Sequence, residues 1–240
     1  MSNSVDCWIC GNPATSREHK IKRSDLRAVL GTPTQEKPFY YHDGTTKKNR
    51  LVRSLKADCL KLPSRLCARC NNQRTQPYDR AWEHLSCWLR NRRPSLKVGD
   101  VICADCIWTQ GATEQMQYVQ LYFTKLTGCH LVQAGINFDR KSLADSILIR
   151  RANPHIYLKF RLSRKASFVG MTDLLSGAPP AHDPRGFAVW IYALGSLAIE
   201  VQYVNTGGGP IALPDAWHPA SGLNKFVITA PLDEREPQKG

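Results

Sequence analysis

Two Cys-x-x-Cys pairs are the residues of this sequence whose types and spacing point most directly to chemistry. Cys7 and Cys10 form the first pair, and Cys67 and Cys70 form the second. Zinc takes four soft ligands in a tetrahedron, and two such turns from distant parts of a chain can supply them. The spacing therefore predicts a structural zinc site that brings the two segments together.

The predicted zinc site would gather three polar side chains. Glu18 and His19 follow the first cysteine pair, and Asn71 follows Cys70 directly. An imidazole can accept a proton from water at neutral pH, and carboxylate and carboxamide oxygens suit a hard cation. The trio favours metal-dependent phosphodiester hydrolysis, with His19 as general base and with Glu18 and Asn71 as ligands of a catalytic Mg²⁺ or Mn²⁺. Taken singly, the same residues also read as a surface pair and a helix cap.

The net charge of +13 is concentrated in the first hundred residues, which hold 20 Lys and Arg against nine Asp and Glu. A basic surface favours a polyanion partner, because cations placed on phosphates release counterions. A solvated basic surface without a partner is the alternative, and an anionic membrane fits less well. Lys56 also belongs to a basic run in the insert at 35–57. The residues predicted to contact nucleic acid are Lys47, Lys48, Arg50, Arg53 and Arg74.

The order Cys-x2-Cys, acid-His, Cys-x2-Cys-Asn resembles that of the HNH (ββα-metal, or His-Me finger) endonucleases. It is closest to the phage recombination endonuclease VII group, and it covers about residues 5–90. The resemblance implies that Glu18 and Asn71 bind the catalytic metal, that His19 is the base, and that DNA, preferably double-stranded, is the partner. The sequence departs from the family in having Glu where Asp is commoner, a long span between His19 and Cys67, and Leu62 where the family has its middle Asn.

The remaining cysteines leave two interpretations open. Cys103 and Cys106 could hold a second zinc together with Cys87, Cys129 or His130, or they could be free thiols. Nine cysteines without a secretion signal favour a reducing, cytoplasmic location over a disulfide framework. We also expect no membrane segment, because no stretch is long and apolar enough.

Residue patterns predict an α+β protein in two parts. Residues 1–95 would form the zinc-stabilised ββα-metal nuclease domain, and residues 96–240 a small α+β recognition or regulatory domain with an antiparallel sheet. Helices are predicted over 23–30, 79–90 and 139–151. Strands are predicted over 118–123, 156–162, 187–193, 198–204 and 226–230, with a hairpin turn at 194–196.

Three functions follow from these patterns. The first is a metal-dependent DNA endonuclease, a hydrolase that could serve restriction or anti-phage defence. The second is a non-catalytic, zinc-stabilised module that binds nucleic acid. The third is a toxin or anti-phage effector whose nuclease is switched on by its own C-terminal domain or by a partner. The C-terminal domain could also form a homodimer or bind a regulatory partner.

Overall fold

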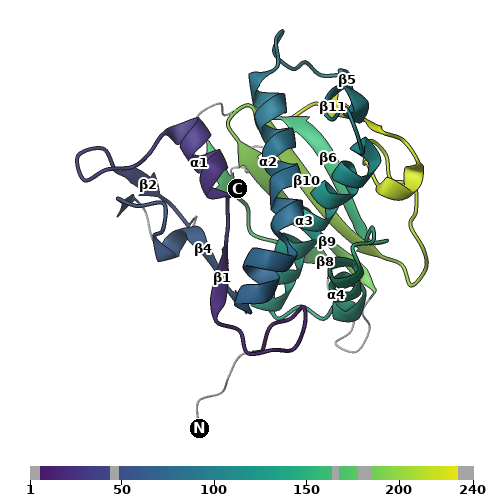
Figure 1. Cartoon of the computed structure of the whole chain (residues 1–240), viewed down its shortest axis with the longest axis horizontal. Helices are drawn as coiled ribbons and strands as arrows, with labels where there is room; N and C mark the ends of the chain where they lie inside the picture. Colours follow the sequence, from purple (N-terminus) through teal and green to yellow (C-terminus); the bar gives the residue numbers. More distant parts are fainter. Residues whose placement is uncertain (1–5, 44–48, 164–167, 178–184, 232–240) are drawn as a thin grey trace, which may run out of the picture.

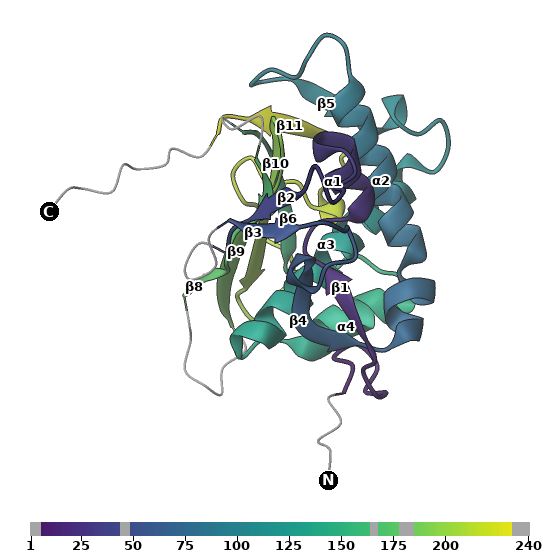
Figure 2. The ribbon, with the colours of Figure 1, turned by 90° about the vertical axis from the view of Figure 1, so that its left-hand side faces the viewer.

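A seven-stranded sheet covered on one face by helices forms the body of the molecule (Figures 1 and 2). The computed structural model describes residues 6–43, 49–163, 168–177 and 185–231. The sheet order is β5 (Val101–Cys103), β11 (Lys225–Thr229), β6 (Ile156–Leu162), β10 (Leu197–Asn205), β9 (Gly186–Leu194) and β7 (Val169–Met171), with β8 (Leu175–Gly177) also paired to β9. The covering helices are α2 (Gln76–Asn91), α3 (Ala112–Ala134) and α4 (Arg140–Ile149). The fold is therefore mixed α+β, as predicted.

Most strands of this sheet lie where the sequence predicts them. The hairpin of β9 and β10 turns at Gly195, whose φ of 64° favours glycine. The sheet is antiparallel, as predicted, except that β11 runs parallel to β6. β11 enters the sheet after a long connection, so nothing forces it to form a hairpin with its neighbour.

The predicted strand at 118–123 is instead part of α3. Its aromatic and β-branched residues fit a strand by type, but this helix is buried on nearly every side, so apolar residues occupy all of its faces. Gly111 and Gly135, with φ of 66° and 65°, delimit the helix. No helix in the described part of the chain is long and apolar enough to cross a membrane.

A second, two-stranded sheet lies beside the helices. β1 (Ser16–His19) and β4 (Lys61–Leu66) pair antiparallel, and α1 (Arg23–Leu30) follows β1. The short hairpin of β2 (Phe39–Tyr41) and β3 (Arg50–Val52) projects from this side (Figure 1). After β4 the chain passes through the π-helical turn η2 (Arg69–Arg74) into α2. The paired strands β1 and β4 thus both precede α2 in the first half, with α1, β2 and β3 between the two strands.

One hydrophobic cluster crosses the predicted boundary near residue 95. It runs from the first cysteine pair to β11, so the two halves share a core. Trp8, inside the first cysteine pair, lies on α3 at Gly128 and donates its indole N–H to the Sγ of Cys129 at 3.4 Å. Arg140 of α4 donates to the backbone carbonyl of Trp8 at 3.0 Å. The first half therefore packs onto the second as part of the same body.

Replacing Gly128 by Val should destabilise the protein by about 1–3 kcal/mol or more, because even a Cβ there would overlap the Trp8 ring. Urea unfolding followed by tryptophan fluorescence measures the loss. Gly208→Val is the matched control, since nothing lies within 4 Å of a Cβ at Gly208. Equal stability of the two variants would contradict the close packing of Trp8 on α3.

Candidate functional site

The four predicted zinc cysteines meet in space. The sulfurs of Cys7, Cys10, Cys67 and Cys70 all lie within 4.8 Å of one another, and those of Cys10 and Cys67 are 3.5 Å apart. Zn–S bonds of about 2.3 Å in a tetrahedron place sulfurs roughly 3.8 Å apart. This group, of which all but Cys10 are buried, could hold a structural zinc ion with small adjustments.

A charged side chain, that of Arg74, donates a hydrogen bond to the cysteine group. Arg74 donates from Nη1 to the Sγ of Cys70 at 3.0 Å, which places a positive charge beside sulfurs that would be thiolates on zinc. The hydrogen bond from Cys70 lowers the pKa of Cys7 to about 4, and the same bond raises the pKa of Cys70. Arg74, predicted to contact nucleic acid, therefore has a structural partner at the cysteines.

His19 and Asn71 line the same cleft, as the sequence predicts. The cleft lies along β1, the loop before β4, and the start of η2. Asn71 donates from Nδ2 to the backbone carbonyl of Arg17 at 3.3 Å, which fixes the carboxamide against β1. Its Oδ1 and the Nδ1 of His19 are buried without a hydrogen-bond partner among the described residues. Unpaired buried acceptors are costly, so two of them in one cleft mark a place for a cation, a donor or water.

The imidazole of His19 is held neutral. Its pKa is lowered from 6.5 to about 4, first by burial and then by the positive charges of Arg23, Lys61 and Lys22, while the backbone carbonyl of Leu60 acts in the opposite direction. At neutral pH the ring therefore keeps a free nitrogen lone pair that can accept a proton.

Glu18 does not join His19 and Asn71 in the cleft. Its Oε2 lies 2.8 Å from the Nζ of Lys125, an α3 side chain with no exposed surface, and Asp79 of α2 lies 3.1 Å from the same nitrogen. Burial alone would lower the pKa of Lys125, but the two carboxylates outweigh it and raise the pKa above its usual value. The predicted metal ligand is thus an ion-pair partner of α3 and does not line the cleft.

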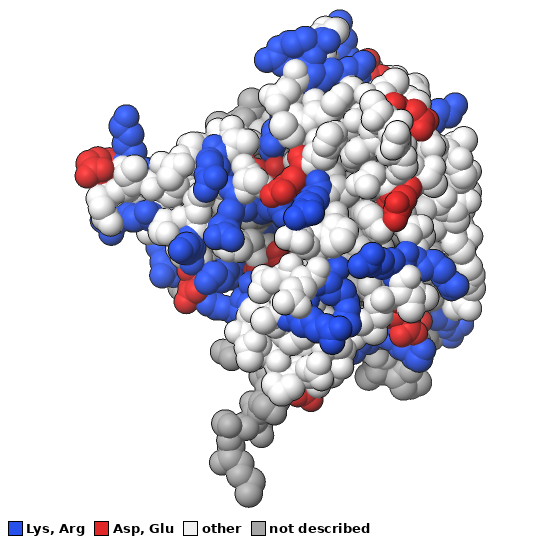
Figure 3. All heavy atoms as spheres, in the orientation of Figure 1, with Lys and Arg blue, Asp and Glu red and all other residues white. Residues whose placement is uncertain are grey.

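Lys and Arg side chains gather over α1, β1 and β4 (Figure 3). The cations that line the cleft are Arg17, Arg23, Lys56 and Lys61. Of the predicted nucleic-acid contacts, Arg50 and Arg53 are exposed on or beside β3 but do not line the cleft, while Lys47 and Lys48 lie outside the described residues. The structure has a cleft lined by cations, but these cations are not the five predicted to contact nucleic acid.

The sequence contained information on which cations line the cleft, but our prediction did not use it. Arg17 is two residues before His19, so in a strand both side chains share a face. Lys61 is the direct cross-strand partner of His19. A strand prediction at 16–19 would have placed Arg17 in the cleft and Glu18 outside it.

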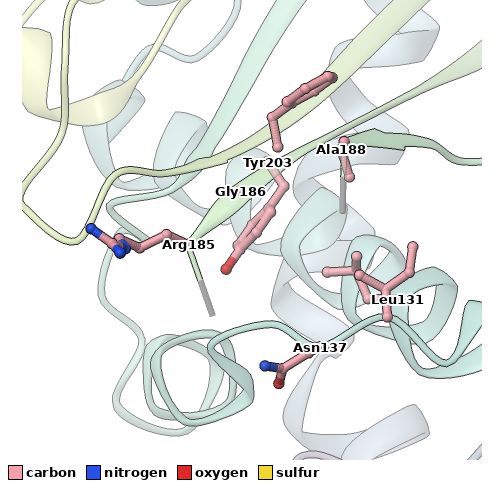
Figure 4. A pocket seen from close by; sticks show the side chains of 9 residues that line it. Leu131, Asn137, Arg185, Gly186, Ala188 and Tyr203 are labelled. Carbon is pink, nitrogen blue, oxygen red and sulfur yellow. The ribbon is translucent and has the colours of Figure 1, made fainter. Parts of the chain in front are cut away.

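Other candidate places carry less chemistry. Cys103 and Cys106 join no group of three or more potential metal ligands among the described residues. A small second hollow lies between the end of α3 and β9, lined by apolar and neutral side chains such as Leu131, Ala188 and Tyr203, together with Arg185 (Figure 4). The residues that line it include no carboxylate, histidine or cysteine. The cleft at His19 is therefore the candidate site.

The chain was compared with protein-family models, curated proteins and solved structures, and nothing matches it.

The cysteine group predicts one zinc per chain, measurable by inductively coupled plasma mass spectrometry on protein purified without added metal. Cys67→Ser should lose the ion and much of the folding cooperativity, because such sites contribute on the order of 10–16 kcal/mol in zinc-finger peptides. Cys87→Ser, which alters an exposed thiol outside the group, should keep both. Full zinc content in Cys67→Ser would contradict the assignment.

Lys125→Met should destabilise the protein by about 3–5 kcal/mol, because it removes the buried counter-charge of Glu18 and leaves Asp79 with Lys22. Adding Glu18→Gln should recover part of that loss, as chemical denaturation of both variants would reveal. Lys141→Met, which breaks an exposed pair with Asp145, should change little. No recovery in the double variant would argue against the Glu18–Lys125 pair.

Proposed function

We propose that this protein is a divalent-metal-dependent DNA endonuclease of the HNH type, acting preferably on double-stranded DNA. The observation that carries the proposal is the pair of unpartnered buried atoms, His19 Nδ1 and Asn71 Oδ1, in one cation-lined cleft. The cysteine group next to Asn71 and the order of β1, β4 and α2 support the same proposal.

His19 would act as the general base. Its neutral ring can take a proton from a water that attacks the phosphorus atom. A pKa near 4 makes a weak base, but three cations contribute to that low value. A bound phosphate would offset those charges and raise the pKa of His19 toward its ordinary value.

Asn71 would hold the cation through Oδ1, which needs a partner and is anchored by its own Nδ2. Mg²⁺ accepts few protein ligands and keeps waters and substrate oxygens. When bound, it would stabilise negative charge on the phosphate and on the leaving oxygen. Glu18 could add a second protein oxygen only by leaving Lys125.

The cleft cations would hold the DNA backbone. Arg23 lies on α1, where its side chain is exposed, and it lines the same cleft as His19. Asp25 fixes α1, since it accepts hydrogen bonds from Trp82 at 2.8 Å and Arg90 at 2.7 Å. A phosphate-binding side chain is useful in catalysis when its supporting element is rigid.

A non-catalytic module that binds nucleic acid remains the second candidate, because the basic cleft suits binding alone. Binding requires no unpaired imidazole, so the state of His19 favours the enzyme. A role in restriction or anti-phage defence, and a regulatory or dimerising role for residues 96–240, stay predictions.

His19→Ala should lower plasmid cleavage by about 10²–10⁴-fold with Mg²⁺ or Mn²⁺, because the base is lost. Asn71→Ala should also lose activity, and EDTA should abolish it. The acid limb of the wild-type kcat/KM, which reports the free enzyme, should lie below the ordinary pKa of histidine, since the pKa of His19 is lowered. His84→Ala, outside the cleft, is the matched control. Cutting that persists in His19→Ala would overturn the assignment, and binding without cutting across several DNA forms would favour the module.

A further inference from the structure

Asp58 is the only acidic side chain among the described residues that line the cleft. It begins the short turn η1 (Asp58–Leu60), directly before β4. Its Oδ1 forms ion pairs with the Nη2 of Arg17 at 2.5 Å and with the Nζ of Lys61 at 3.0 Å. Two charged donors that converge on one oxygen form the arrangement with which proteins bind a phosphate oxygen.

This anion lies beside the proposed base. Lys61 is the cross-strand partner of His19, and Arg17 lines the same cleft. Directly opposed residues in an antiparallel pair have Cβ atoms about 4.5–5.5 Å apart. Any anion held by Arg17 and Lys61 is therefore a close neighbour of the imidazole.

The side chains of the two cations are more buried than that of the carboxylate. The exposed fractions of the Arg17 and Lys61 side chains are 31% and 25%, whereas that of Asp58 is 70%. The cations lower the pKa of Asp58, so it stays ionised and paired at neutral pH. An exposed ion pair contributes little to stability, so a competing anion can replace the carboxylate at small cost.

We propose that Arg17 and Lys61 form a phosphate-binding subsite and that Asp58 is its internal stand-in, a carboxylate that the nucleic-acid backbone displaces on binding. This inference rests on the proposed function in taking nucleic acid as the ligand. The tethered carboxylate competes with single phosphate ions and so weakens their binding a few-fold. A polyanion gains contacts elsewhere in the cleft at the same time and overcomes the competition. The subsite thus selects polymers over free phosphate.

The test is the affinity for a fluorescent DNA duplex, measured by anisotropy in EDTA so that no cutting occurs. Asp58→Asn should tighten binding roughly two- to fivefold, the range that exposed ion pairs span. Glu36→Gln changes the net charge equally on an exposed residue that bonds Thr34 outside the cleft, and it should have a smaller effect. Asp58→Asn should also let inorganic phosphate compete with the duplex, which the wild-type protein resists.

The pairing is tested in a second background. In the double variant Arg17→Gln/Lys61→Gln, the gain from Asp58→Asn should fall to that of Glu36→Gln, because no cations remain to be released. Equal effects of Asp58→Asn and Glu36→Gln, or a full gain without the two cations, would overturn the subsite.

These results separate the subsite from the nuclease proposal. Tighter binding by Asp58→Asn without cleavage under any metal supports the subsite and defeats the nuclease. Cleavage that depends on His19, with binding unaffected by Asp58→Asn, defeats the subsite and leaves the nuclease standing.

Discussion

A buried ammonium group cannot remain charged inside a protein without counter-charges, and Lys125 shows how this chain meets that requirement. Its Nζ has Glu18 on β1 and Asp79 on α2 within ion-pair distance, while the residue itself belongs to α3. Separating β1 or α2 from α3 would remove one of the two counter-charges of this buried ammonium group. The strand that carries His19 is therefore tied to the helix of the second half by electrostatics as well as by apolar packing.

A zinc ion held by the cysteine group would impose a second tie of a different kind. Such an ion would fix the chain on either side of the cleft, since one pair precedes β1 and the other ends where Asn71 begins. Arg140 and Trp8 attach the first pair to the helical layer. Asn71 is also held against β1 by its hydrogen bond to the backbone carbonyl of Arg17. Such an arrangement leaves the polar atoms of His19 and Asn71 fixed before any ligand arrives.

Local signals made much of the fold predictable. The cysteine spacing, the β9–β10 hairpin at Gly195 and helices α1, α2 and α4 depend on residues close together in sequence, so their patterns can be read directly. The strand predicted at 118–123 failed because aromatic and β-branched residues suit a strand and a fully buried helix equally well. β1 and β4 carry mixed polar residues without clear alternation, and they were not predicted.

The candidate site was predictable only in part, for related reasons. His19 and Asn71 were found because the cysteines fix them from nearby. Glu18 was placed in the cleft because β1 was unrecognised, and its partner Lys125 lies far along the chain with no local signal. Cations were expected from composition, but Arg17 and Lys61 can be recognised as neighbours of His19 only once the strand pairing is known.

The contact between Trp8 and Gly128 also bears on the order in which the chain is made. A ribosome releases the cysteine pairs, His19 and Asn71 well before α3, at about 5–20 residues per second. Until α3 emerges, Trp8 has no surface to pack on and Glu18 has no buried cation to face. The nascent chain consequently carries all the residues of the cleft for some seconds without their finished arrangement, and synthesis of the second half is what completes it.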